Sequence, residues 1–243
     1  MASNHHEDEV FRQKRKPKNP IKFKVSLNEE QKEAKAKILE NTVTLLAGSA
    51  GSGKTFLACQ IALEKLFTRE IEKVIITRPT VSKEEIGFLP GDLREKMDPW
   101  VQPIYQNMYA LYDKEKIEKC IQEGQIEIVP VSFMRGRTFL DSVVIVDEAQ
   151  NVTHEQMQMI VTRIGLRSKM IICGDDHQVD LKSKKDSGFR FLYTAARKIK
   201  NMIGISLTTN HRDPIVESLI ELYEEAEEQG ISLGTAGSSG KRK

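Results

Sequence analysis

The sequence predicts a three-layer α/β domain with a mostly parallel β-sheet. Short runs rich in Val and Ile recur along the chain with little alternation, which is typical of strands buried on both faces of a parallel sheet. Helical stretches separate these runs, and this alternation favours a sheet covered by helices on both sides. At 243 residues, the chain suits one such domain of ordinary size with small additions.

The elements follow in order. A helix is expected to begin after Asn28, whose side chain can cap the first turn, and to run to about Glu40. The predicted strands cover 43–47, 73–77, 126–129, 143–146, 169–173 and 203–207. The predicted helices between and after them cover 55–67, 99–111, 114–123, 153–163, 188–200 and 214–228. The segment 81–125 exceeds an ordinary crossover in length and contains several Gly and Pro residues, so we expect a helical insertion there.

The two ends of the chain differ in composition from its middle. Residues 1–25 include a basic run without acidic residues, which predicts a flexible basic arm, either a solvating tail or a contact for nucleic acid. Residues 231–243 mix Gly and Ser and predict a disordered tail. The folded domain is therefore expected over 26–230.

Composition sets few limits on partners. The net charge of +2 is too small to indicate one. Three well-separated cysteines show no metal-ligand spacing, and an odd, sparse count points to a reducing compartment. The N-terminus lacks the apolar core of a signal peptide, and no apolar run approaches the ~20 residues that span a bilayer. The sequence therefore predicts a cytoplasmic protein that does not act at a membrane.

A glycine-rich loop follows the first predicted strand. It matches the phosphate-binding pattern G-x-x-x-x-G-K-[ST] at every fixed position through Gly48, Ser49, Ala50, Gly51, Ser52, Gly53, Lys54 and Thr55. Between a strand and a helix, the backbone N–H groups of such a loop face phosphate oxygens, and the helix N-terminus adds to the attraction. Lys54 can reach the outer phosphates, and the Thr55 hydroxyl can hold Mg²⁺. The loop predicts a nucleoside triphosphate site.

Polar side chains follow two further predicted strands. Asp147 and Glu148 directly follow the predicted strand 143–146. In open α/β folds, ligands bind at the carboxyl ends of such strands. Asp147 can hold Mg²⁺ through water, and Glu148 can polarise the water that attacks the phosphate. Gln178, in the turn after 169–173, can hydrogen-bond the γ-phosphate or that water. The alternative interpretation is a set of ordinary polar residues at strand ends.

These residues resemble known ATPase motifs. Lys54-Thr55, Asp147-Glu148-Ala149-Gln150 and Gly174-Asp175 with Gln178 resemble motifs I, II and III of superfamily 1 helicases. More closely, the chain resembles the PhoH-like family, the phosphate-starvation-inducible ATPases, over roughly 28–228. Further residues that carry this resemblance are Ile76-Thr77-Arg78-Pro79, Gly87-Phe88-Leu89-Pro90-Gly91-Asp92, Arg135-Gly136-Arg137-Thr138-Phe139, Thr162-Arg163-Ile164-Gly165 and Asp180-Leu181. The resemblance implies a single RecA-like ATPase domain, an association with RNA or single-stranded nucleic acid, helicase-type activity and a homo-oligomeric ring, most simply a hexamer.

The resemblance also implies roles for three residues. Similar superfamily 1 proteins read the adenine edge with a glutamine at the position of Gln31, which favours ATP over GTP, although an exposed helix residue is the alternative. Arg212 resembles the arginine of an Asn-aromatic-Arg element, with His211 in place of tyrosine. Arg163 is a second arginine that could act across a subunit boundary. Either arginine could stabilise charge on the transferring phosphate or serve as a surface ion-pair partner.

Two loops offer candidate contacts for nucleic acid. In helicases, the counterpart of the loop after the predicted β-strand 73–77 touches the backbone of the bound nucleic acid. A second basic loop precedes the predicted β-strand 143–146. The candidate residues are Arg78, Thr80, Lys83, Arg135 and Arg137. Phe139 lies beside the second loop and could stack on a base or pack in the core.

The sequence and the resemblance together predict an ATP- and Mg²⁺-dependent ATPase that acts on single-stranded RNA or DNA as a helicase or translocase. The alternative is an ATP-gated switch that binds RNA or protein without unwinding. A small-molecule kinase shares the phosphate loop but has no use for the other two motifs.

Overall fold

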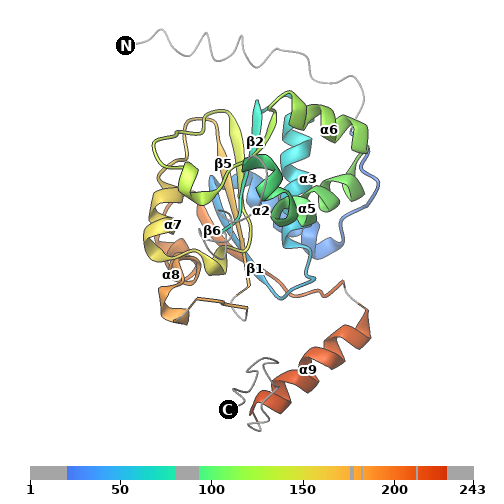
Figure 1. Cartoon of the computed structure of the whole chain (residues 1–243), viewed down its shortest axis with the longest axis vertical. Coiled ribbons are helices and arrows are strands. Elements are labelled where there is room, and N and C mark those ends of the chain that lie inside the picture. The colour runs from blue at the N-terminus through green and yellow to red at the C-terminus, as the bar shows by residue number, and fades with distance from the viewer. Residues whose placement is uncertain (1–20, 80–92, 176–177, 182, 212, 229–243) are drawn as a thin grey trace, which may run out of the picture. The chain divides into compact units, whose positions relative to one another are not determined.

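The computed structural model describes residues 21–79, 93–175, 178–181, 183–211 and 213–228 (Figure 1). The chain divides into two compact units, Met1–Thr209 and Asn210–Lys243. The first contains the whole sheet, and the second contains helix α9 (Pro214–Glu228). Within the described ranges, no helix is long and apolar enough to cross a bilayer.

The sheet has six parallel strands in the order β3-β2-β4-β5-β1-β6. The strands are β1 (Val43–Gly48), β2 (Lys73–Thr77), β3 (Ile126–Ile128), β4 (Ser142–Val146), β5 (Lys169–Gly174) and β6 (Met202–Leu207). Ala47 of β1 pairs with Gly174, and Val146 of β4 pairs with Ile172. Because β5 lies between β1 and β4, the carboxyl ends of these three strands meet at one edge. The prediction of a parallel α/β sheet is confirmed.

Helices cover both faces of the sheet. The helices of the first unit are α2 (Glu29–Glu40), α3 (Lys54–Phe67), α5 (Leu93–Leu111), α6 (Lys114–Gln122), α7 (His154–Val161) and α8 (Gly188–Ala195), with short 3₁₀ turns η1 (Val131–Phe133), η2 (Ala149–Asn151), η3 (Lys184–Asp186) and η4 (Ala196–Lys198). Helices α3, α5 and α6 lie on one side of the sheet and α7 and α8 on the other (Figure 1). Successive strand residues point to opposite faces. Val143 and Ile145 of β4 therefore join the core under α2, α3, α5 and α6, whereas Val144 and Val146 join the core under α7 and α8.

The predicted elements agree closely with those observed, with two exceptions. The helix predicted over 188–200 ends at Ala195, and the 3₁₀ turn η4 follows it. We predicted a helix over 99–111, but α5 begins at Leu93 and includes two prolines, Pro99 and Pro103. Proline removes a hydrogen bond inside a helix but is tolerated in its first turn, so the sequence places the start of this helix at Pro99. Tertiary packing compensates, because Ile104, Met108 and Leu111 are fully buried in the core against which α3 also packs.

Candidate active site

The glycine-rich loop joins the buried end of β1 to the start of α3. Gly51 and Gly53 adopt φ values of +89° and +81°, in the left-handed region that favours glycine. At Gly48, an added Cβ would lie 2.5 Å from the carbonyl oxygen of Leu207 and 2.6 Å from Ser52 Oγ. Gly53 precedes α3 without a side-chain cap, so the first N–H groups of the helix face the loop. The loop thus has the geometry that holds phosphate groups.

Lys54 folds back over this loop. Its ammonium nitrogen donates to the carbonyl oxygens of Gly48 at 2.7 Å and Ser49 at 2.8 Å, and lies 3.4 Å from Ser52 Oγ. A positive charge therefore sits on the side of the loop where a phosphate would bind. The contact of Lys54 with the outer phosphates stays a prediction.

Thr55 and Asp147 meet across the strand ends. Thr55 Oγ1 donates a hydrogen bond of 2.6 Å to Asp147 Oδ1, joining the start of α3 to the end of β4. Asp147 is buried, and burial raises the pKa of its carboxyl group, whereas the Thr55 hydrogen bond acts in the opposite direction.

This pair fits a magnesium ion. A hydroxyl and a carboxylate are hard oxygen ligands, and Mg²⁺ in nucleotide sites takes few protein ligands because phosphate oxygens and water complete its octahedron. Elsewhere in the described part of the chain, no group of three or more His, Cys, Asp or Glu side chains forms a metal site. Thr55 and Asp147 are therefore the residues that would hold Mg²⁺ beside a bound nucleotide.

Glu148 lies beside this pair with a strained backbone and a carboxylate that two side chains contact. Its φ of +49° is uncommon for a residue with a side chain and is found at sites that need a fixed side-chain direction. Arg78 Nη2 lies 3.3 Å from Glu148 Oε1, and Gln150 Nε2 donates to Glu148 Oε2 at 2.7 Å. The sequence predicted a catalytic role for Glu148 but neither of these contacts.

Gln150 is a site residue that the sequence analysis missed. Its side chain is 1% exposed, and its Oε1 accepts a hydrogen bond of 3.0 Å from the backbone N–H of Asp175. Gln150 therefore connects Glu148, at the end of β4, to the end of β5. The sequence did offer one indication of its role. Gln150 is a polar residue in the motif Asp147-Glu148-Ala149-Gln150, which directly follows a buried strand.

Gln178, the predicted third member of the site, has an exposed side chain. Residues 176–177 before it lie outside the described residues. The end of β5 does reach Glu148, but it does so through the backbone of Asp175 and the amide of Gln150. The contact of Gln178 with phosphate or water stays a prediction.

The remaining nucleotide-site candidates have local partners or lie outside the described residues. Gln31 and Asn28 form a capping box at the start of α2, in which Asn28 N donates to Gln31 Oε1 at 3.2 Å. The carbonyl oxygen has a second lone pair, so this bond leaves the adenine role open as a prediction. Arg163 donates to the carbonyl oxygens of Met159 and Arg137 and to Thr162 Oγ1. Arg212 lies outside the described residues.

The candidates for nucleic-acid contact are only partly described. Arg135 is exposed, whereas Arg137 donates to Glu127 Oε2 at 2.7 Å and lies over the ring of Phe139 at 5.0 Å. Phe139 is 4% exposed and packs in the core under α7 and α8, which confirms the core alternative. Thr80 and Lys83 lie outside the described residues.

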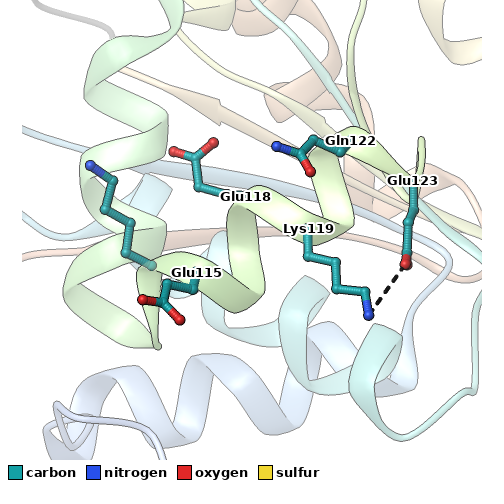
Figure 2. Close-up of a pocket in the computed structure, with 6 residues that line it drawn as sticks. Glu115, Glu118, Lys119, Gln122 and Glu123 are labelled. Atoms are coloured by element: carbon teal, nitrogen blue, oxygen red, sulfur yellow. Dashed lines mark ion pairs between the residues drawn. The ribbon is translucent and has the colours of Figure 1, made fainter.

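A surface pocket on α6 contributes nothing to this arrangement. Figure 2 shows the residues that line it, which come from α6 and the position after it. They carry mixed charges, and Lys119 Nζ pairs with Glu123 Oε1 at 3.7 Å. Such a composition is typical of a solvated helix face.

Comparison with known proteins identifies relatives of the chain. A family model described as PhoH-like protein matches residues 24–224. The PhoH-like protein of Synechocystis sp. is 42% identical over 193 residues, which cover 78% of this chain and 59% of the relative. The PhoH-like protein of Bacillus subtilis is 43% identical over 200 residues, which cover 80% and 62%. The chain thus spans about three fifths of the length of these relatives.

Two solved structures that partly resemble the chain share little sequence with it. The Pif1 helicase of Candida albicans is 17% identical with a TM-score of 0.45, over 83% of this chain and 44% of that chain. The large terminase of a thermophilic bacteriophage is 11% identical with a TM-score of 0.48, over 85% and 50%. These values concern the fold and transfer no activity.

The described sheet, the glycine-rich loop and the carboxylates at the end of β4 together make a parallel α/β domain with the features of a P-loop nucleotide site. The family match covers most of that domain and includes the loop and both carboxylates. The chain therefore belongs to the PhoH-like protein family.

Proposed function

We propose that this domain hydrolyses ATP with Mg²⁺ and that single-stranded RNA or DNA stimulates the hydrolysis. The observation that carries the proposal is the hydrogen bond from Thr55 Oγ1 to Asp147 Oδ1, with Glu148 next in the chain. It brings two magnesium ligands and a carboxylate that can accept a proton to the edge of the sheet where the phosphate loop ends.

The roles of the residues follow from their positions. Loop N–H groups and Lys54 would bind the phosphates, and Thr55 and Asp147 would hold the ion that neutralises their charge. The carboxylate of Glu148 would orient the water that attacks the terminal phosphorus and accept its proton as ADP leaves. Arg163 or Arg212 would stabilise charge on that phosphate, and Gln31 would read the adenine edge.

The proposal of a nucleic-acid partner is supported by Arg78, at the end of β2, and by the exposed Arg135. One relative structure, a Bacteroides Pif1, is described as bound to single-stranded DNA, which is a property of that protein. Replacing Arg78 with Ala should weaken strand binding and flatten its dependence on log salt by ~1. Strand affinity measured over a salt series checks this.

The direct test is steady-state ATP turnover with and without single-stranded RNA or DNA, using Lys54→Ala as the inactive control. The proposal expects turnover that the strand raises. If the strand changes neither turnover nor ATP affinity, the nucleic-acid part fails. If ATP changes the affinity for the nucleic-acid strand but no duplex is unwound, the protein would instead be an ATP-gated binding switch.

We also propose that the protein acts as a homo-oligomeric ring, by family resemblance a hexamer. In a ring, an arginine of one subunit can reach the nucleotide of the next, which is a recognised source of phosphoryl-transfer acceleration. Light scattering with ATP and Mg²⁺ tests this, and a monomer at working concentrations would contradict it.

A further inference from the structure

The carboxylate of Glu148 is contacted on its two oxygens by two very different side chains. Arg78 Nη2 lies 3.3 Å from Oε1, and Gln150 Nε2 lies 2.7 Å from Oε2. Arg78 comes directly after β2, and Gln150 comes from the short turn η2 after β4. The candidate general base is therefore attached to two elements at once.

The hydrogen bond from Gln150 to Glu148 comes from a buried side chain that is itself held in place. The Gln150 side chain is 1% exposed, and its Oε1 is fixed by the backbone N–H of Asp175 at 3.0 Å. A buried amide with both ends engaged cannot leave Glu148 without leaving the N–H of Asp175 unpaired, which is costly. Gln150 thus acts as a fixed anchor for Oε2.

The contact of Arg78 with Glu148 is one that a phosphate group can replace. The Arg78 side chain is 24% exposed and that of Glu148 is 39% exposed. A separation of 3.3 Å exceeds the usual ~2.7–2.9 Å of a charge-assisted hydrogen bond, so this partly buried ion pair is weaker than one in close contact. Phosphate is a strong competitor because the planar guanidinium can bind two of its oxygens together.

The strand order gives this ion pair a direction. In the sheet β3-β2-β4-β5-β1-β6, strand β2 lies on one side of β4, whereas β5 and β1 lie on the other. The phosphate loop follows β1, so Arg78 contacts Oε1 of Glu148 from the side of β4 away from that loop. A water that attacks the terminal phosphate would lie on the opposite side, toward the loop.

We propose that Arg78 is a gate on Glu148 and that a phosphodiester of the single strand opens it. With Arg78 engaged by the strand, Oε1 is released while Gln150 still holds Oε2, and the carboxylate rotates toward the phosphate loop. Strand binding is thereby coupled to ATP hydrolysis through one ion pair. This inference rests on the proposed function, because it requires an ATPase that binds a single strand.

The test compares the 243-residue chain with its Arg78→Ala variant, and ATP turnover is measured without nucleic acid and at saturating single-stranded RNA. The gate predicts that Arg78→Ala raises the basal kcat by about two- to five-fold, equivalent to ~0.4–1 kcal/mol, because the restraint on Glu148 is gone. It also predicts that saturating strand no longer raises kcat in this variant. A residue that only bound the strand would lower strand affinity and leave the basal kcat unchanged.

Two further variants keep the result interpretable. Lys119→Ala removes a basic charge and an exposed ion pair of 3.7 Å from α6, and its basal kcat should equal that of the wild type. Arg78→Lys keeps the charge but loses the forked donor, so its basal kcat should lie between the wild type and Arg78→Ala. ATP affinity is measured in each variant as well, and a value equal to that of the wild type would show that the nucleotide site is intact.

The outcomes separate the gate from the function on which it rests. If the strand stimulates the wild type, but Arg78→Ala has wild-type basal turnover and full stimulation at saturating strand, the gate is wrong and the proposed function stands. If the strand leaves wild-type turnover unchanged, the proposed function fails and the gate fails with it.

Discussion

The proposed proton acceptor, Glu148, directly follows a buried strand beside the proposed magnesium-binding pair, yet its carboxylate is 39% exposed. Its neighbour Asp147 is 6% exposed and accepts a hydrogen bond from Thr55. The proposal thus gives adjacent carboxylates separate roles, one in holding the ion and one as a proton acceptor. Glu148 also has a left-handed backbone conformation, which is uncommon for a residue with a side chain.

Glu148→Gln should therefore separate binding from chemistry. The amide keeps the size of the side chain but cannot accept a proton, so kcat should fall by about a hundred-fold or more while ATP affinity stays near that of the wild type. Fluorescent-nucleotide titration and steady-state turnover measure the two quantities. A loss of ATP affinity as large as that of Lys54→Ala would contradict the role assigned to Glu148.

Gln150 can be tested as a positioning residue with two variants. Gln150→Glu can still accept from Asp175 N, but its buried carboxyl group would lie against the carboxylate of Glu148, so kcat should fall by roughly a hundred-fold at unchanged KM for ATP. Gln150→Ala leaves the N–H of Asp175 unpaired and should also lower the free energy of unfolding by ~1–3 kcal/mol. Equal kcat in wild type and Gln150→Glu would remove the positioning role.

The residues found from the sequence and those missed differ in how local their signals are. The loop through Thr55, with Asp147 and Glu148 at a strand end, is visible because each lies in a short pattern beside a buried strand. The contact of Arg78 with Glu148 and that of Asp175 N with Gln150 were missed because they depend on the order of the strands, which no local pattern encodes. Gln150 was quoted within a motif, but its burial became visible only in the fold.

At the scale of elements, α2 is tied to the far strand β6 by one carboxylate. Glu30 accepts hydrogen bonds from Thr208 N at 2.7 Å, Thr208 Oγ1 at 2.8 Å and Thr209 N at 3.0 Å. Partial burial alone would raise the pKa of Glu30, but these hydrogen bonds outweigh it and lower the pKa from 4.5 to about 2. The helix that carries Gln31 is thereby fastened to the end of β6.

This tie predicts a specific acid sensitivity. Because the folded pKa of Glu30 is depressed, its contribution to stability is complete above about pH 4.5 and is lost as pH falls from there toward 2. Glu30→Gln should be less stable than the wild type at neutral pH, and the difference should shrink over that range. Chemical denaturation at a series of pH values measures it, with Glu29→Gln as the control. A difference that does not change with pH would show that the Glu30 charge is unimportant.

The boundaries of most elements were predictable because capping and burial are local. Asn28 caps α2 as expected, and the Val- and Ile-rich runs became the strands. Helix α5 shows where this reasoning stops. Its first turns contain Pro99, which locally favours a helix start, yet the helix begins at Leu93 because packing of its later turns stabilises the whole element.

A core substitution in α5 tests that explanation. Ile104 is fully buried in the core shared with α3, so Ile104→Ala should lower the free energy of unfolding by ~2–5 kcal/mol. Gln102→Ala, at an exposed position of the same helix, should change it by less than ~0.5 kcal/mol. Urea denaturation distinguishes them, and equal effects would mean that α5 is not held by this core.

At the scale of the whole molecule, the sheet brings together residues that are far apart in the sequence. The order β4-β5-β1 places three carboxyl ends side by side, and the hydrogen bonds of Thr55 with Asp147 and of Gln150 with both Glu148 and Asp175 connect them. The parallel fold and this convergence were predictable, because parallel strands in an open α/β sheet share one binding edge. The proposed ring assembly and the proposed nucleic-acid partner would depend on contacts between molecules, which neither local patterns nor one chain's packing encodes.

A crystal structure with Mg²⁺ and a non-hydrolysable ATP analogue tests the convergence of these strand ends most directly. We predict the terminal phosphate against Lys54, Mg²⁺ about 2.0–2.1 Å from Thr55 Oγ1 with Asp147 holding it through water, and Glu148 on the same side of that phosphate. A nucleotide bound elsewhere, or a terminal phosphate that none of these side chains approaches, would contradict the account.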